Sequence, residues 1–176
     1  FRIHLGQLNV GEGMRYAHAA LPDSAVTLLY LGRGKEAARQ WLDEAIRRPS
    51  PMHEILLYQL HDERAALLAE LGRGSEAIAD LDRAVELMGD RPSEFLVRKK
   101  ARLLHELKRY DEAIVVLRSL ARIERNYLKQ SDLLEIGRVL ADAGRTEEAK
   151  KAYRDLLADS QVGAAAAKAL AELENR

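Results

Sequence analysis

The chain has 176 residues, of which 47% are hydrophobic and only 5% aromatic, with 28 basic and 28 acidic side chains. The balanced charge argues against a bulk attraction to nucleic acid, and the absence of cysteine excludes disulfides and thiol chemistry. No stretch approaches the roughly 20 apolar residues of a membrane-spanning helix. Because the chain begins with Phe1 instead of methionine, we expect a processed protein or a fragment. The compartment stays open between the cytoplasm, which we favour slightly, and the periplasm.

Residues 1–22 form an N-terminal segment with two alternative interpretations. Apolar and polar side chains alternate over residues 1–5, which is compatible with a short strand. We favour a helix over residues 12–21, as the second half of an upstream repeat. A short helix is expected to follow over residues 24–31, with its N-cap at Asp23 or Ser24.

An eight-residue pattern then occurs four times and organises the rest of the chain. Its shared alanines lie 40, 36 and 36 residues apart, at Ala37, Ala77, Ala113 and Ala149. A fixed period in this range is the signature of stacked helical repeats. The sequence therefore predicts pairs of helices joined by short turns.

The second copy of the pattern, residues 71–78, shows what each position does. Gly72 suits the left-handed backbone that ends a helix. Ser75 is expected to cap the next helix, and Glu76 favours its positive end. Ala77 is small, so the two helices can lie close together. The third copy has Lys108 at the glycine position, where a left-handed conformation would cost about 1 kcal/mol.

The periodicity predicts a series of helices along the remaining chain. We expect the helix after Pro51 to contain the four extra residues of its longer repeat, since four residues make about one helical turn. Ser93 is expected to cap one first helix, and Asp132 with Glu135 has the spacing of a capping box for another. Trp41 is expected in the core. The predicted helices are 35–48, 51–71, 76–88, 94–107, 111–125, 132–143, 146–159 and 163–174.

These features resemble the tetratricopeptide repeat family over roughly residues 24–160. The matches are small residues on the first helix of each pair (Ala65, Ala101 and Gly137), the turn, and the Glu-Ala that opens the second helix. The resemblance implies an all-α, right-handed α-α superhelix of about four helix-turn-helix repeats. The expected divisions are a repeat array at 23–160, with repeats at 23–50, 51–92, 93–129 and 130–160, and a capping helix or truncated repeat at 161–176.

In this family the first helix of each pair lines a concave groove, which implies a binding surface. Arg98, Arg102 and Arg138 would bind carboxylates there, beside the apolar Phe95 and Leu134. The alternative is that these arginines pair with acids on adjacent helices. Helical spacing gives eight groove candidates: Gln59, Asp62, Phe95, Arg98, Arg102, His105, Leu134 and Arg138.

Residues with catalytic or metal-binding chemistry form no specific motif. Glu54, Tyr58 and His61 share a helical spacing, but a surface-facing triplet without a second histidine or a cysteine is a weak metal site. We therefore expect no catalytic residue, no cofactor and no metal. The expected function is a non-catalytic scaffold or adaptor that binds a protein or peptide partner, one with an acidic group, in its groove. The alternatives are a regulatory or targeting region of a larger enzyme, or a self-associating module that forms homo-oligomers.

Overall fold

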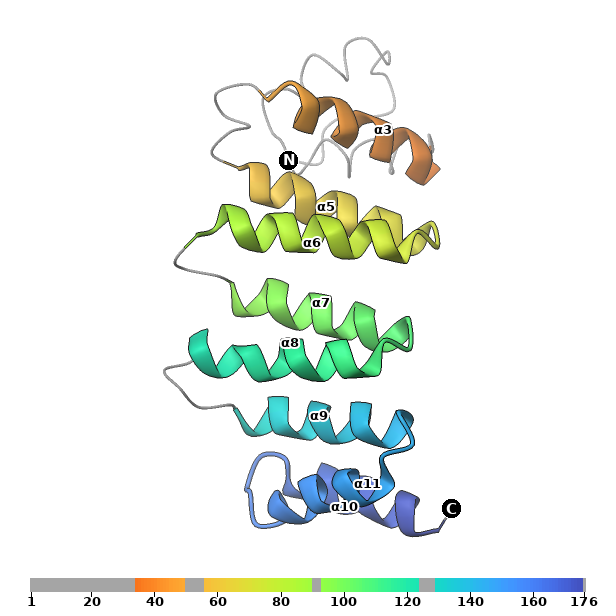
Figure 1. Cartoon of the computed structure of the whole chain (residues 1–176), viewed down its shortest axis with the longest axis vertical. Helices are drawn as coiled ribbons and strands as arrows, with labels where there is room; N and C mark the ends of the chain where they lie inside the picture. The colour runs from red at the N-terminus through yellow and green to blue at the C-terminus, as the bar shows by residue number, and fades with distance from the viewer. Residues whose placement is uncertain (1–33, 50–55, 90–92, 124–128, 176) are drawn as a thin grey trace, which may run out of the picture. The chain divides into compact units, whose positions relative to one another are not determined.

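The computed structural model describes residues 34–49, 56–89, 93–123 and 129–175 (Figure 1). These residues contain eight α-helices and no strand, as the sequence predicts. None of these helices is both long enough and apolar enough to cross a membrane. The predicted strand or helix within residues 1–22 and the helix at 24–31 fall outside the described residues. The chain divides into two units, residues 1–90 and 91–176.

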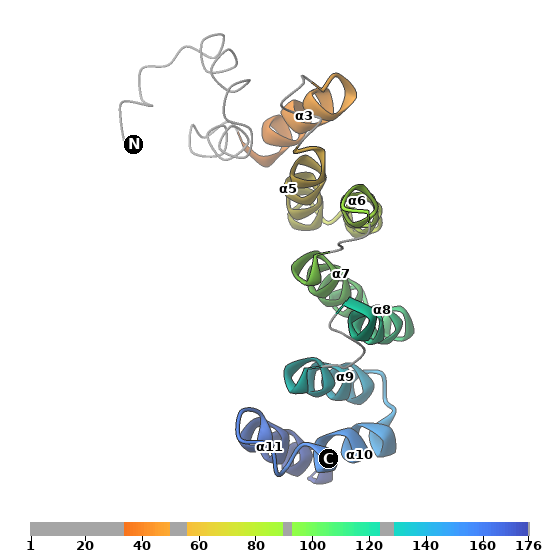
Figure 2. The same ribbon diagram turned by 90° about the vertical axis from the view of Figure 1, so that its left-hand side faces the viewer.

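The first unit contains α3 (Gly34–Arg47), α5 (Leu57–Glu70) and α6 (Gly74–Leu87). Helices α5 and α6 form an antiparallel hairpin, and α3 packs against α5 (Figure 2). Trp41 is 5% exposed, which confirms its predicted place in the core. It packs in a cluster whose other buried members are Ala38, Leu42, Ala45, Leu60 and Leu67.

The second unit contains α7 (Glu94–Glu106), α8 (Tyr110–Ile123), α9 (Gln130–Asp142), α10 (Thr146–Asp155) and α11 (Gly163–Glu174). Helices α7 and α8 form one hairpin, α9 and α10 form the next, and α8 packs against α9. The last helix packs against α10 and also contacts α9. The predicted alanines at the helix crossings, Ala113 and Ala149, are fully buried.

The same turn closes all three hairpins. In each, the backbone N–H of the third residue after the helix donates to a carbonyl five residues earlier: Arg73 to Leu68 at 2.8 Å, Arg109 to Leu104 at 2.8 Å, and Arg145 to Leu140 at 2.9 Å. The residue before each arginine is left-handed: Gly72 has φ 75°, Lys108 60° and Gly144 76°. This geometry satisfies carbonyls that the helix end leaves open, and Lys108 adopts the left-handed conformation that glycine takes in the other two turns.

Replacing Lys108 by glycine is expected to raise the free energy of unfolding by about 1 kcal/mol, because glycine has no Cβ to clash at positive φ. Urea unfolding of the variant and the parent measures this difference. Lys108→Ala keeps the Cβ and should show no such gain. A glycine variant no more stable than the alanine variant would contradict the argument.

Several predicted helix ends differ from the structure. Helix α5 begins at Leu57, and at 14 residues it is only one residue longer than α7 and α9, which have 13. The predicted start of this helix at Pro51, and with it the predicted place of the four-residue insertion, lies among residues 50–55, outside the described part of the chain. Helix α10 ends at Asp155, short of the predicted 159.

The predicted caps are also partly wrong. Helix α6 begins at Gly74 with Arg73 at the N-cap, so Ser75 lies inside the first turn. Ser93 does occupy the N-cap of α7, with extended backbone, but its side chain makes no capping bond. Helix α9 begins at Gln130, which places Asp132 within the helix, where it is 3% exposed. A buried carboxylate needs another partner, and Asp132 has one on a different helix.

Candidate functional site

Arg98 on α7 is the partner of Asp132. Its Nε donates to Asp132 Oδ1 at 2.7 Å and its Nη2 donates to Oδ2 at 2.9 Å, while Nη1 donates to Glu94 Oε2 at 3.0 Å. Lys129 Nζ adds a 2.8 Å bond to the same Glu94. Bidentate pairs of this kind have fixed geometry. Arg98 therefore joins α7 to α9, as the alternative interpretation of the groove arginines expected, and its guanidinium is committed within the chain.

Two other candidates on α7 face solvent. Phe95 is 66% exposed, an unusual exposure for a large aromatic side chain. The Lys99 ammonium lies 6.0 Å from the centre of the Phe95 ring, within the range of a cation–π contact. Arg102 is also exposed, and among the described residues it forms no ion pair. Phe95, Lys99 and Arg102 together are called the α7 face below.

The candidates on α9 have different environments. Leu134 is 6% exposed and packs in the core, so it offers no apolar surface to a ligand. The Arg138 side chain is about half exposed, at 52%, and donates to Glu135 at 3.1 Å.

In the first unit, Gln59 and Asp62 are half-buried on α5, and Gln59 Nε2 donates to the Tyr58 hydroxyl at 3.0 Å.

His105 connects the end of α7 to α9. The His105 Nε2 lies 2.8 Å from Asp142 Oδ2, and its Nδ1 lies 4.0 Å from Glu135 Oε1. The centroids of the His105 and Tyr110 rings are 5.7 Å apart, and the rings form an edge-to-face contact. Because an ionised carboxylate only accepts, Nε2 carries the proton in the bond to Asp142. The Tyr110 contact packs the His105 ring against the first residue of α8.

His105 and Arg138 meet at a cleft that sequence reasoning did not find. The cleft has a volume of about 480 Å³ and lies between α9, α10 and α11. This volume falls within the roughly 300–1,000 Å³ range of ligand sites. We call it the α11 cleft; its lining residues are His105, Arg138, Ala141, Asp142, Tyr153, Ala165, Lys168, Ala169, Glu172 and Leu173.

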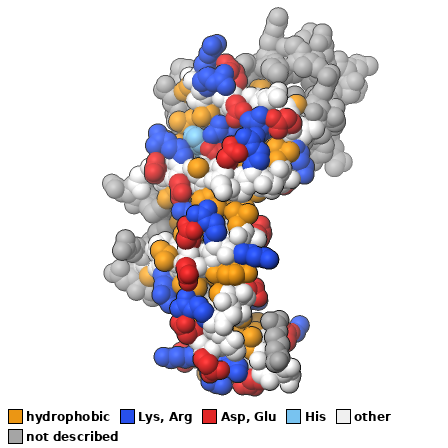
Figure 3. Space-filling model, turned by 45° about the vertical axis from the view of Figure 1, so that its right-hand side comes forward, with side chains coloured by type: hydrophobic (Ala, Val, Ile, Leu, Met, Phe, Trp, Pro, Cys, Tyr) orange, Lys and Arg blue, Asp and Glu red, His pale blue; other side chains and the backbone are white. Residues whose placement is uncertain are grey.

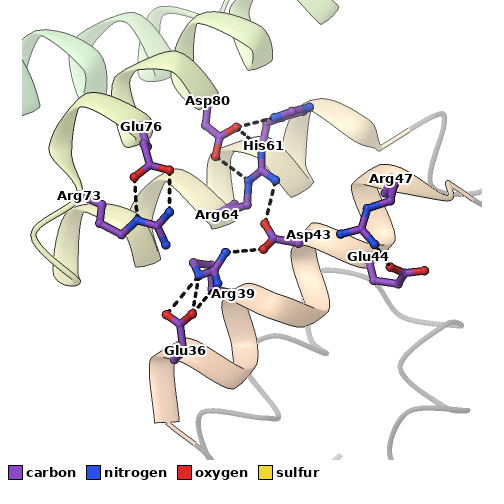
Figure 4. Close-up of polar contacts among 10 residues, drawn as sticks. All are labelled: Glu36, Arg39, Asp43, Glu44, Arg47, His61, Arg64, Arg73, Glu76 and Asp80. Atoms are coloured by element: carbon purple, nitrogen blue, oxygen red, sulfur yellow. Dashed lines mark hydrogen bonds and ion pairs between the residues drawn. The ribbon is translucent and has the colours of Figure 1, made fainter.

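The first unit contains an ionic network that links its described helices (Figure 4). Arg64 on α5 donates twice to Asp80 on α6, at 2.7 and 2.6 Å, and once to Asp43 on α3, at 2.9 Å. Arg39 also donates to Asp43. His61 is 7% exposed, so it does not face the surface as predicted; its Nδ1 lies 2.8 Å from Asp80 Oδ1. The network joins the three helices described in this unit, α3, α5 and α6.

The pKa of Asp80 reflects this environment. Burial alone would raise it, but the hydrogen bonds and charges of Arg64 and His61 outweigh burial, and the net pKa lies below the usual 3.8. The carboxylate is therefore ionised at neutral pH, and His61 Nδ1 is the donor in their hydrogen bond. The hydrogen bonds of Asp80 with Arg64 and His61 therefore serve to hold α5 and α6 together. In the described part of the chain, no three histidine or acidic side chains gather in a way that could hold a metal ion.

The surface charge is mixed in sign. Figure 3 shows a face on which acidic and basic side chains lie interspersed. Many of these side chains pair with a residue three positions away. Examples are the bidentate contacts of Arg73 with Glu76, Arg109 with Glu112, and Arg145 with Glu148. Such exposed pairs contribute little to stability. They also leave little uncompensated charge with which this surface could attract a charged partner.

Comparison with known proteins supports the fold. Two solved structures are similar: one described as "MamA RS-1 ArsTM double mutant" (19% identity, 95% of this chain and 97% of that chain covered, TM-score 0.59) and one as "MamA 41-end from Desulfovibrio magneticus RS-1" (18%, 95% and 98%, TM-score 0.57). A search of curated proteins finds no match. At these identities the structural likeness concerns the fold alone, an all-α helical repeat.

A tetratricopeptide repeat family model matches residues 99–127. The match runs from within α7 through the whole of α8, and so covers the hairpin that carries the Lys108 turn. The other two hairpins repeat the geometry of this turn. The predicted resemblance to the tetratricopeptide repeat family is thus confirmed for this hairpin, and the similar solved structures support an all-α helical repeat fold for the chain.

Proposed function

We propose that the chain is a non-catalytic scaffold that binds a protein partner on the α7 face. The repeat family suggests a role in protein–protein interaction. The observation that carries the specific proposal is the exposure of Phe95, whose ring remains 66% accessible. An exposed aromatic beside an arginine has the composition of an interface hot spot.

The α7 face offers both kinds of contact within a short distance along one helix. Phe95 and Arg102 are seven residues apart, which places them two helical turns apart on the same side of α7. The Phe95 ring would supply apolar area, and the Arg102 guanidinium would supply directed hydrogen bonds to carbonyl or carboxylate oxygens. Since Arg98 is already paired with Asp132, the reason for requiring an acidic partner is weaker than the sequence suggested.

Truncating Phe95 to alanine is expected to weaken the partner's binding by roughly 2 kcal/mol, about thirtyfold, because the anchor's buried area is lost. The measurement is a pull-down from the source organism's lysate, followed by titration of the captured protein. Arg102→Glu should weaken binding as well.

Val115→Ala provides the matched control, because Val115 is 67% exposed but lies on α8. This variant should retain the partner at parental affinity. Equal retention by the Phe95→Ala and Val115→Ala variants would refute the proposal that the α7 face is the interface. All variants are first compared by circular dichroism, so that a loss of fold is not mistaken for a loss of contact.

A further inference from the structure

The α11 cleft contains a buried hydroxyl whose role the fold does not explain. Tyr153 is 2% exposed, and its ring packs against Gly137 on α9. No hydrogen bond to the Tyr153 hydroxyl is formed by any residue in the described part of the chain. A buried hydroxyl without a partner costs about 1–3 kcal/mol. Such a group inside a protein generally has a water or a ligand to bind.

Tyr153 lines the cleft together with charged side chains that act on its hydroxyl. Burial raises the pKa of Tyr153, Arg138 acts to lower it, and Asp142, Glu135 and Glu172 act to raise it. Three of these charged groups, Arg138, Asp142 and Glu172, line the cleft with Tyr153 itself. With its pKa raised, the phenol stays protonated at neutral pH and is available to donate a hydrogen bond.

The charges around the cleft cancel. Arg138 and Lys168 supply two positive charges, and Asp142 and Glu172 supply two negative ones. Arg138 also donates to Glu135, and Asp142 accepts from His105. Because these charges balance, the cleft offers a ligand of either sign no net electrostatic attraction. The remaining lining is mostly small and apolar: Ala141, Ala165, Ala169 and Leu173.

We propose that the α11 cleft binds an uncharged stretch of a partner's polypeptide. In this arrangement a carbonyl oxygen of the partner accepts a hydrogen bond from the Tyr153 hydroxyl, and small apolar side chains of the partner contact Ala165 and Ala169. The proposal rests on the proposed function, since it names the chemistry of the bound partner. The sequence suggested a partner with an acidic group, whereas the lining of the α11 cleft favours a neutral segment.

Three blocked tripeptides test the proposal as probes: acetyl-alanyl-glutaminyl-alanine amide and its glutamyl and lysyl counterparts. They are titrated at millimolar concentrations into the labelled full chain, and the amide NMR signals of α9 and α11 are followed. The neutral peptide should shift the cleft signals, and both charged peptides should bind several-fold more weakly. Tyr153→Phe, which removes only the hydroxyl, should weaken the neutral peptide's binding by roughly three- to tenfold.

Two further variants make the result specific. Ala165→Trp fills the cleft from an exposed position and should abolish the signal shifts. Tyr58→Phe, the same chemical change in the first unit, should leave them unaltered. The proposal is overturned if Tyr153→Phe binds the neutral peptide as the parent does, if the glutamyl peptide binds at least as tightly as the neutral one, or if no cleft signal moves.

The outcomes separate this inference from the proposed function. A protein partner lost on Phe95→Ala but bound normally by Tyr153→Phe would leave the scaffold role intact and refute only the role of the cleft. Peptide binding that depends on Tyr153, together with no partner that depends on Phe95, would refute only the role of the α7 face.

Discussion

Replacing Asp80 by alanine should lower the free energy of unfolding by about 3–5 kcal/mol. The Asp80 carboxylate accepts three hydrogen bonds, two from Arg64 and one from His61. Its side chain is 6% exposed, and those of His61 and Arg64 are 9% and 22% exposed. Removing the Asp80 carboxylate leaves the charged guanidinium of Arg64 largely out of water, with Asp43 as its remaining described partner. The cost is therefore mainly that of an uncompensated charge.

The dependence of this effect on pH identifies its origin. The folded pKa of Asp80 lies below its usual value of 3.8, so its contribution is fully present above that value and is lost as the pH falls through the folded pKa. The difference in unfolding free energy between the parent and Asp80→Asn should accordingly be largest near neutral pH and should shrink in acid. Urea unfolding at a series of pH values measures it.

Glu76 offers a control on the same helix as Asp80. It forms a bidentate pair with Arg73, but both side chains are exposed, so Glu76→Ala should leave stability almost unchanged. Hydrogen exchange should show the effect of Asp80→Ala in α3, α5 and α6, the three helices that the network joins. Similar losses for the two variants, or a difference for Asp80→Asn that is constant with pH, would contradict the role given to burial.

Truncating Tyr153 to alanine should also cost about 3–5 kcal/mol, because a buried aromatic ring is replaced by a cavity. The ring lies directly on Gly137: a Cβ at this position would be 2.6 Å from Tyr153 Cε1 and 3.0 Å from Cδ1. Gly137→Ala should therefore destabilise the chain by about 1–2 kcal/mol, even though alanine is the better helix former by about 1 kcal/mol.

The sign of the Gly137→Ala effect should reverse when the ring is absent. In the Tyr153→Ala background the new methyl group meets no ring, so only its helix propensity remains and the double variant should be more stable than Tyr153→Ala alone. Chemical unfolding of the four chains in this cycle measures the coupling. Tyr153→Phe keeps the ring and should preserve the penalty of Gly137→Ala. Additive effects in the alanine cycle would show that the two residues do not contact each other.

The features that the sequence predicted correctly depend on local backbone chemistry. The turn at Lys108 follows from its alignment with Gly72 and Gly144, because the same helix-ending hydrogen bonds need the same left-handed residue. Helix α11 was predicted with its observed bounds, Gly163–Glu174, from its alanine content and the spacing of its apolar residues. Neither prediction required knowledge of residues distant in the chain.

The predictions that failed depend on distant partners. Asp132 resembled half of a capping box, but Arg98, 34 residues earlier, holds it within the helix. Helical spacing placed Leu134 on the groove side of α9. Because α9 is packed by α8, α10 and α11, this side chain is buried instead. The α11 cleft was missed because it combines side chains from four helices. The signal that could have indicated it is Tyr153, a tyrosine where the other copies of the pattern have Trp41, Leu81 and Leu117.

The order in which the helices pack has a consequence for how the fold is reached. Among the helices that the structure describes, the extensive contacts within each unit join one helix to the next along the chain. The smaller contact of α11 with α9 skips one helix. Little loop-closure entropy opposes such pairings, and proteins built from local contacts fold quickly. Each hairpin can nucleate independently of the others, and growth then proceeds by docking the next helix. Each pair is stabilised only when its neighbour covers its apolar face, so we expect folding to spread along the chain from the first pairs that dock.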